Sequence, residues 1–143
     1  MLSKSSKYAL KAILYLAVNS SADKKIMVKN ISAPINVPQA YIAKLLQELS
    51  KHNIVSSARG PNGGFYMSNE NKKIPLIEVI NIIDGEDRLN SCLLSLHNCN
   101  NDKPCPLHHL AGPYRTAFID NMKRKTINDM VIDIENEHSF LPL

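Results

Sequence analysis

The sequence has no tryptophan, and aromatic residues make up only 6% of its 143 residues. An apolar fraction of 44% is nevertheless enough for a core built mainly from aliphatic side chains. No apolar run approaches the length of a membrane span, so we expect no membrane partner. The first residues lack the apolar core and cleavage site of a signal peptide, which predicts a cytoplasmic protein.

Sequence signals of enzymatic activity are also missing. No paired carboxylates, no nucleophile beside a base and no cofactor loop stand out. The glycine-rich segment from Arg59 to Gly64 lacks the Gly-Lys-Ser/Thr ending of a phosphate-binding loop, and we expect a strand rather than a helix after it. We therefore do not expect an enzyme, and a small metalloenzyme is the most remote function considered.

Cysteine is scarce, and its placement is informative. All three cysteines, Cys92, Cys99 and Cys105, fall within residues 92–108, called the cysteine loop below. His108 follows the third cysteine at C-x-x-H spacing, and the Asn, Asp and Pro between the cysteines are typical of a loop. In a reducing cytosol, clustered cysteines indicate metal or redox chemistry rather than structural disulfides. Three is also an odd number, so pairing within one chain would leave one thiol over.

Thiolates and an imidazole on one loop are suitable ligands for a soft metal ion or an iron–sulfur cluster. The candidate metal ligands are therefore Cys92, Cys99, Cys105 and His108. Three cysteines and one histidine also form a structural zinc pattern, so zinc is the main alternative. A thiol-based redox switch without a metal is a further alternative.

Charge is distributed unevenly along the chain, although the net charge is only +4. Residues 1–73 contain eleven Lys and Arg against three Asp and Glu, whereas residues 74–143 contain six against ten. A basic N-terminal half is expected of a protein that binds nucleic acid, but an ordinary lysine-rich surface would give the same count. A motif is needed beside the charge.

That motif begins with two short helices. Apolar residues recur at helical spacing over residues 6–18, and a further short helix fits residues 28–33. Pro34 lacks a backbone donor and is expected to end this second helix. Asn36 can adopt the left-handed conformation of a sharp turn, and Pro38 suits the first position of the next helix.

The helix expected over residues 38–50 has an apolar face and a polar, basic one. Two helices joined by a tight turn, the second carrying polar and basic side chains, describe a helix-turn-helix. In this interpretation the second helix is the recognition helix, which enters the major groove of DNA. Its candidate DNA contacts are Gln39, Tyr41 and Lys44.

Two β-prone runs, residues 54–57 and 65–67, flank a turn-rich tip and predict a hairpin. A hairpin directly after a helix-turn-helix is a wing. Arg59 lies at the base of this wing, where a guanidinium can reach a phosphate or the minor groove. The candidate DNA contacts of the wing are Arg59, Gly60, Pro61, Asn62 and Gly63.

Three more helices are expected after the wing. The first covers residues 74–84, and the second covers residues 110–125, where Gly112-Pro113 is expected to delay or kink the start. Thr126 and Asp129 form a capping-box pattern that begins the last helix.

Several of these segments match the pattern of a known family. They are Ser6 to Leu10, Tyr41 to Leu45, Val55 to Phe65, the helix from Pro75 to Asp84-Gly85, the three-cysteine loop, and Lys125 to Ile127. Through them the chain resembles, over nearly its whole length, the Rrf2 family of bacterial winged-helix regulators. The family usually spaces its cysteines C-x5-C-x5-C, whereas the first gap here is one residue longer, a change that loop-closure entropy tolerates.

The resemblance implies a dimeric DNA-binding protein. Members of the family are homodimers that hold an iron–sulfur cluster in the cysteine loop and use its state to set their affinity for double-stranded DNA. The implied fold is mostly α with a small β-wing. A winged-helix head occupies residues 1–73, and residues 74–143 contain a helix, the cysteine loop and a dimerisation helix from about Leu110 to Lys125.

The resemblance also bears on the fourth ligand that a cluster needs beside three thiolates. IscR-like members place a histidine at the position of His108. NsrR-like members use an Asp of the partner chain, and the matching residue here is Lys7, which cannot ligate as a cation. The alternatives are His97, His109, Asp102 or a small exogenous thiol.

The resulting hypothesis is a transcriptional regulator whose operator affinity is set by a two-iron or four-iron cluster, sensing cluster status, redox conditions or nitric oxide. Because the loop lies between the wing-side helix and the dimerisation helix, a bound cluster is expected to bias the spacing of the two DNA-binding heads. The alternative is a zinc-bound or thiol-switched winged-helix regulator without iron.

Overall fold

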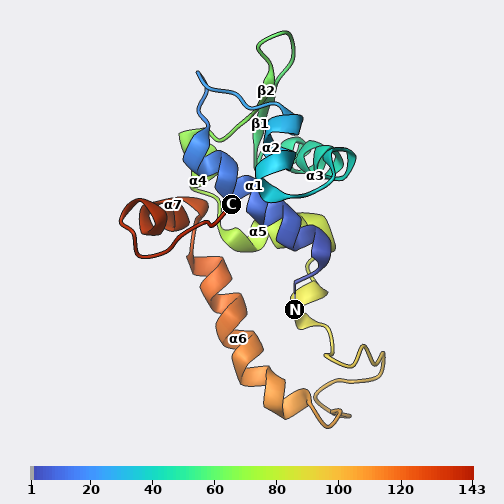
Figure 1. Ribbon diagram of the computed structural model, residues 1–143. Coiled ribbons are helices and arrows are strands. Elements are labelled where there is room, and N and C mark those ends of the chain that lie inside the picture. The colour runs from blue at the N-terminus through green and yellow to red at the C-terminus, as the bar shows by residue number, and fades with distance from the viewer. Residues whose placement is uncertain (1) are drawn as a thin grey trace.

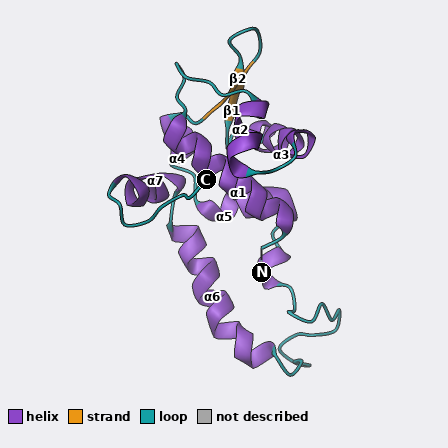
Figure 2. Ribbon diagram, in the orientation of Figure 1, coloured by secondary structure: helices purple, strands orange, loops and turns teal. Residues whose placement is uncertain are grey.

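Helices predominate in the computed structural model, which describes residues 2–143 (Figures 1 and 2). In chain order the elements are α1 (Lys4–Asn19), α2 (Val28–Ile35), α3 (Gln39–Lys51), β1 (Ser56–Ala58), β2 (Gly64–Tyr66), α4 (Asn69–Lys72), α5 (Leu76–Asp84), the 3-10 turn η1 (Arg88–Asn90), α6 (His108–Arg124) and α7 (Ile127–Glu135). The mostly α architecture with a small β-wing is therefore confirmed. None of the described helices is both long enough and apolar enough to cross a membrane.

Helix α1 is the centre of the core. It packs against α2, α3, α5 and α7, and its small residues Ala9, Ala12 and Ala17 let these neighbours approach closely. The aliphatic side chains of Ile13 and Leu16 are fully buried between them. The core is thus aliphatic, as the absence of tryptophan requires, and α1 connects the head to the helices that follow the wing.

Helices α2 and α3 form the helix-turn-helix. Asn36 ends α2 in the left-handed conformation, with φ 54° and ψ 53°, which confirms its expected role in the turn. The expectation that Pro34 ends α2 is wrong, because the helix runs on to Ile35. The proline removes one backbone donor within the last turn, and the N–H of Asn36 still caps the carbonyls of Ser32 and Ala33.

The wing is a two-stranded antiparallel hairpin in which Ser57 pairs with Phe65. Ile26 adds a bridge on the other side, because its N–H donates to the carbonyl of Phe65 at 2.9 Å and its carbonyl accepts from the N–H of Phe65 at 2.8 Å. Gly64 makes this approach possible. It has φ 149°, and a Cβ there would lie 2.6 Å from the carbonyl oxygen of Ile26. The wing is therefore fixed to the segment before α2.

The base of the wing is fixed by α4, a short helix that the sequence patterns did not reveal. Ser68 and Asn71 form a capping box around α4, and Asn71 is buried. Its side chain accepts from the hydroxyl of Ser56 at 2.8 Å and donates to the carbonyl of Asn53 at 2.9 Å. One buried amide thus joins the end of α3, the first wing strand and α4, which leaves the base of the wing little freedom.

Helices α5 and α7 return to the core of the head. Their starts are joined by two backbone bonds, from the N–H of Leu76 to the carbonyl of Lys125 at 2.9 Å and from the N–H of Ile127 to the carbonyl of Ile74 at 3.0 Å. The capping box expected at Thr126 and Asp129 is present. Because side chains of α5 and α7 are buried in the same core as α1, α2 and α3, residues on both sides of position 73 share one core. The division at that position remains a prediction about function.

Helix α6 differs from the others, because none of its residues is buried. It extends away from the head as a single rod, with the cysteine loop beside its far end (Figure 1). The expected start at Leu110 is wrong: the helix begins at His108 and includes Gly112 and Pro113. Pro113 lies in the second turn, so its ring costs one intrahelical hydrogen bond without preventing the helix from starting earlier.

Candidate metal centre and nucleic-acid interface

The cysteine loop brings its three thiols together. The sulfur atoms of Cys92, Cys99 and Cys105 all lie within 4.8 Å of one another, and the sulfurs of Cys92 and Cys105 are 3.7 Å apart. All three are free thiols. Cys105 is buried, whereas Cys92 and Cys99 are half-buried. Residues far apart along the loop thus converge on one point, as expected of a set of metal ligands.

His108 lies on the Cys99 side of this group. Its Nδ1 is 3.3 Å from the sulfur of Cys99, and its Nε2 is 3.1 Å from the side-chain oxygen of Asn101. As the first residue of α6, it is anchored by a backbone bond from its N–H to the carbonyl of Cys105 at 3.0 Å. The Asn101 contact orients the ring and leaves Nδ1 facing the thiol, the arrangement that a metal-binding histidine usually has.

Backbone donors and neighbouring thiols alter the acidity of two of the cysteines. The backbone N–H of Leu96, assisted by that of Leu94, lowers the pKa of Cys92 from 9.0 to about 7 against the opposing effect of desolvation. At Cys99 the N–H of Cys105 acts in the same direction, but desolvation and the neighbouring thiols outweigh it, so the pKa of Cys99 is raised. Of these two thiols, Cys92 therefore becomes a thiolate more readily than Cys99.

The donor set fits a soft metal centre, and the spacings divide it into two pairs. Two thiolates bound to one tetrahedral ion at a metal–sulfur distance of about 2.3 Å lie roughly 3.8 Å apart. The Cys92–Cys105 pair at 3.7 Å and the Cys99–His108 pair at 3.3 Å each have about this spacing. The three thiols are thus close enough together to share one soft metal centre, with His108 beside Cys99 as the candidate further ligand. The same thiolates and imidazole are also ligand types that would hold an iron–sulfur cluster.

In the described part of the chain, the group of mutually close ligand atoms consists of the three thiols. His108 lies outside this group although it contacts Cys99, and the other candidates for the fourth ligand also lie outside it. His109 is exposed and makes an edge contact with the ring of His108, with 5.3 Å between centroids. His97 and Asp102 are exposed on the loop, and Lys7 is exposed on α1. Of the histidines and carboxylates proposed from the sequence, His108 is thus the one that contacts a cysteine sulfur.

The predicted DNA contacts lie on two neighbouring elements. Gln39 and Lys44 are exposed on α3, and Arg59 is exposed at the base of the wing. Gly60, Pro61 and Asn62 are also exposed, and Gly63 is half-buried at the tip. An open groove lies between the start of α3 and the wing, and its lining includes Gln39, Arg59 and Gly63. Of the sequence-derived set, Gln39, Arg59, Gly60 and Gly63 line this groove. Tyr41 and Lys44 line a separate hollow farther along α3.

The structure changes the predicted set of DNA contacts at two residues, Lys29 and Tyr41. Lys29 of α2 lines the groove, although the sequence patterns did not single it out. Its only signal in the sequence was its charge in the basic half. Tyr41 is partly exposed, but its hydroxyl is hydrogen-bonded to Ser5 and its ring packs edge-on against Tyr8, with 5.6 Å between centroids. Tyr41 is therefore held by α1, which limits its reach toward a ligand.

Comparison with known proteins agrees with this arrangement. A family model described as "Rrf2: Iron-dependent Transcriptional regulator" matches residues 2–133. An HTH-type transcriptional regulator of Aquifex aeolicus is 36% identical over 94% of this chain and 92% of its own length. The regulator IscR of Escherichia coli is 28% identical over 93% of this chain and 84% of its own.

The fold has counterparts among solved structures. CymR, described as the global cysteine regulator of Bacillus subtilis, superposes with a TM-score of 0.71 at 22% identity, over 92% of this chain and 95% of that protein. At this identity the likeness concerns the fold alone.

Proposed function

Because the chain belongs to the Rrf2 family of transcriptional regulators, we propose that it binds operator DNA as a homodimer and that a metal centre in the cysteine loop sets its affinity. The observation that carries this proposal is the convergence of three thiols within 4.8 Å on a winged-helix scaffold. As a transcriptional regulator rather than an enzyme, the chain needs the centre as a signal and not as a catalyst.

DNA reading is assigned to the groove between α3 and the wing. The exposed side chains of Gln39 and Lys44 suit base edges and phosphates of the major groove, while Arg59 suits the backbone or the minor groove beside it. Two such heads have to enter major grooves about 34 Å apart, so a homodimer of fixed geometry is part of the proposal.

Arg59→Ala tests this assignment. We expect a loss of about 1–3 kcal/mol in affinity for a duplex selected by the wild type from random-sequence DNA, measured by fluorescence anisotropy. Arg88→Ala is the matched control, because Arg88 is equally exposed but lies in η1, away from the head. Unchanged affinity of Arg59→Ala, with Arg88→Ala also unchanged, would remove the wing from the DNA interface.

The metal centre is assigned to Cys92, Cys99, Cys105 and His108 as the ligands of an iron–sulfur cluster. A bound cluster would supply an oxidisable centre whose charge and occupancy respond to oxygen, nitric oxide or iron supply. The Rrf2 family is described as iron-dependent, which supports iron as the metal. The loop residues hold the ligands in two pairs, and Asn101 orients the histidine that completes the set.

A zinc-bound regulator is the second candidate, and the short sulfur spacing favours it. Three thiols within 4.8 Å already have the dimensions of a single tetrahedral ion. Protein purified without oxygen and analysed for metal and sulfide distinguishes the two candidates. We expect broad visible absorption with iron and acid-labile sulfide. Colourless protein with stoichiometric zinc, and no cluster after anaerobic reconstitution, would select zinc instead.

Dimerisation is assigned to α6, whose first half presents exposed apolar side chains. Leu110 is 68% and Tyr114 is 79% exposed, one helical turn apart. Charging both, as in Leu110→Glu with Tyr114→Glu, should convert a dimer into a monomer in analytical ultracentrifugation. Thr116→Glu is the control on another side of the same helix. A wild-type protein that sediments as a monomer at micromolar concentration would refute the assignment.

Signalling follows from linkage between the two sites. The loop precedes α6 directly, so a centre that fixes the loop also fixes the start of the proposed dimerisation helix. A ligand changes DNA affinity only to the extent that it binds the DNA-competent and the other conformation differently. The proposal therefore requires the affinity for the selected duplex to differ between metal-loaded and metal-free protein.

A further inference from the structure

The C-terminal end of α5 is fastened to the N-terminal end of α1 by one carboxylate. Oδ1 of Asp84 accepts from the hydroxyl of Ser3 at 2.6 Å, and Oδ2 accepts from the hydroxyl of Ser6 at 2.6 Å. The Ser3 oxygen also caps α1 by accepting from the N–H of Ser6 at 3.0 Å. Ser6 is fully buried. We call this trio the Asp84 clamp; since both carboxylate oxygens are engaged, it fixes orientation as well as distance.

The same turn of α1 holds the recognition helix on its other side. The hydroxyl of Ser5 is hydrogen-bonded to that of Tyr41, and the ring of Tyr8 meets the ring of Tyr41 edge-on at 88°. Tyr41 lies in the first turn of α3, the end that lies beside the wing groove. The position of α1 at its N-terminus therefore determines the position of α3 at the end assigned to DNA.

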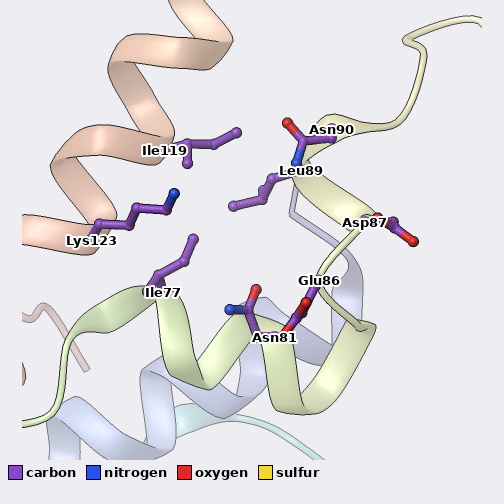
Figure 3. Close-up of a pocket in the computed structure, with 8 residues that line it drawn as sticks. All are labelled: Ile77, Asn81, Glu86, Asp87, Leu89, Asn90, Ile119 and Lys123. Carbon is purple, nitrogen blue, oxygen red and sulfur yellow. The ribbon is translucent and has the colours of Figure 1, made fainter.

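The cysteine loop begins on the opposite side of the clamp. After Asp84 the chain passes through Gly85 and η1 to Cys92. Leu89 of η1 is buried against Ile77 and Ile80 of α5, and Leu10 of α1 and Ile119 of α6 pack on the same cluster. Figure 3 shows Leu89, Ile77 and Ile119 directed into the space between η1, α5 and α6. Because Leu89 is packed on Ile77 and Ile80, the segment between Asp84 and Cys92 is fixed to the body of α5 and is not a free linker.

We propose that Asp84 is a positioning residue that transmits the state of the cysteine loop to the recognition helix of the same protomer. The route runs from Leu89 to Asp84, across the clamp to the first turn of α1, and from Ser5 and Tyr8 to Tyr41. This inference rests on the proposed function, because it needs a metal centre that changes DNA affinity. It assigns Tyr41 to placing α3, in contrast to the direct DNA contact expected from the sequence.

The clamp also accounts for motifs that the DNA and metal sites leave unused. The family resemblance includes the segment beginning at Ser6 and the helix end at Asp84-Gly85, which are far apart in the sequence. In the structure they are hydrogen-bonded to each other. Neither contacts the thiols, and the shared role that the geometry offers is to join the two halves of the molecule.

The test compares the ratio of DNA affinities between metal-loaded and metal-free protein. Loaded protein is reconstituted with ferrous iron and sulfide without oxygen, or with Zn²⁺ in parallel, and titrated with the duplex selected by the wild type. We expect Asp84→Ala to bring this ratio close to one while metal content stays at the wild-type level. Asp87→Ala is the matched control, since Asp87 is exposed in the same segment and its carboxylate has no hydrogen bond within residues 2–143. It should keep the wild-type ratio.

Two milder variants keep the test decisive if Asp84→Ala does not fold. Ser6→Ala removes one hydroxyl of the clamp, and Tyr41→Phe removes the Ser5 bond while keeping the ring contact. Each should move the ratio part of the way from its wild-type value toward one. In metal-free protein, amide hydrogen exchange in the first turn of α1 should be faster for Ser6→Ala than for the wild type. This readout does not depend on the metal.

The outcomes separate this inference from the proposed function. The wild-type ratio could differ clearly from one, and the clamp variants could keep that ratio with full metal content and an unchanged melting temperature. This outcome would overturn the transmission route alone. A wild-type ratio of one would overturn the metal-dependent function and this inference together. A ratio that moves toward one in Asp84→Ala and in Asp87→Ala alike would show a general effect of the lost charge and would also overturn the route.

Discussion

Two adjacent histidines at the start of α6 provide a sharp comparison at the residue scale. Nδ1 of His108 faces the sulfur of Cys99, whereas His109 only touches the neighbouring ring. We expect His108→Ala to weaken metal retention by more than about tenfold in a chelator competition, since the loss of a ligand's supporting partner alone costs that much. His109→Ala should behave as the wild type. Equal retention in both variants would exclude His108 as a ligand and return an exogenous thiol to consideration.

The acidity of Cys92 leads to a second prediction at this scale. Its pKa is lowered to about 7 because backbone N–H groups at Leu96 and Leu94 favour the thiolate, while the pKa of Cys99 is raised. A thiolate forms as the pH rises through the pKa, so alkylation of Cys92 by iodoacetamide in metal-free, reduced protein should increase steeply around pH 7. Cys99 should follow only at higher pH.

Mass spectrometry of the alkylated peptides provides the measurement. A midpoint for Cys92 near that of an ordinary thiol, or identical rates for Cys92 and Cys99, would contradict the electrostatic effect of the loop backbone. Metal loading should protect both residues at every pH, which provides the internal control.

At this scale the sequence predicted which residues form the candidate metal site, but not which residues contact and orient them. Clustered cysteines and the C-x-x-H spacing selected the three residues whose sulfurs converge. Nothing in the spacing revealed Asn101 behind His108 or the tethering of Tyr41, because both depend on contacts made only after the chain folds. An exposed polar face on a helix indicates that the helix binds a ligand. It does not show which of the polar side chains are free to contact that ligand and which are hydrogen-bonded to a neighbouring helix.

At the scale of elements, two glycines permit a paired stability test. Gly64 has φ 149° and a Cβ there would meet the backbone of Ile26, whereas a Cβ at Gly112 would meet nothing within 4 Å. Gly64→Ala should lower the free energy of unfolding by more than about 1 kcal/mol. Gly112→Ala, inside α6, should raise it by roughly 0.5–1 kcal/mol through helix propensity. Urea unfolding measures both.

Opposite signs for the two glycine variants are the decisive result. Destabilisation in both would mean that Gly112 has a packing role in an assembly that the single chain lacks. No effect of Gly64→Ala would mean that the bridge between the wing and Ile26 is not maintained in solution.

Element types were predictable because they follow from local periodicity, and element ends were not. The turn at Asn36 and the capping box at Thr126 were foretold, because each depends on one or two adjacent residues. The two prolines were misjudged. Pro34 and Pro113 are both accommodated inside helices, since a single lost hydrogen bond near a helix end is tolerated when the rest of the turn is capped or packed. Helix α4 escaped notice because Asn71 replaces the usual Glu or Gln of a capping box.

At the scale of the whole molecule, the uneven charge of the two halves predicts salt-dependent DNA binding. Neutralisation of phosphates by Lys and Arg releases counterions, so affinity should fall by about 10³-fold or more between 50 and 200 mM salt. Lys29→Gln should reduce the slope of this dependence by about one charge, since Lys29 lines the groove. Lys123→Gln, on α6, is the control. A salt-independent affinity would contradict the assignment of the basic half to DNA.

The two parts expected from the sequence do not have separate hydrophobic cores in the structure. Charge, motifs and resemblance all separate residues 1–73 from the rest, yet α5 and α7 contribute to the core of the head. Sequence composition describes surfaces well, because charged residues are exposed, but it cannot reveal which apolar faces meet. What projects from the head is the cysteine loop with α6, so the segment assigned to sensing is the one with the least core of its own.

The exposure of α6 has a thermodynamic consequence. Phe118, Ile119 and Met122 hold the last turns of α6 against α5 and η1, but its first turns contain no buried side chain. Helical turns without packing are marginally stable in water, so in an isolated protomer these first turns should unravel. His108, its first residue, would then lose the support that aims its ring at Cys99. Subunit concentration thereby becomes a determinant of metal affinity. Dilution below the dissociation constant of the dimer should release metal without any oxidant, so the abundance of the protein would itself adjust the threshold at which it responds.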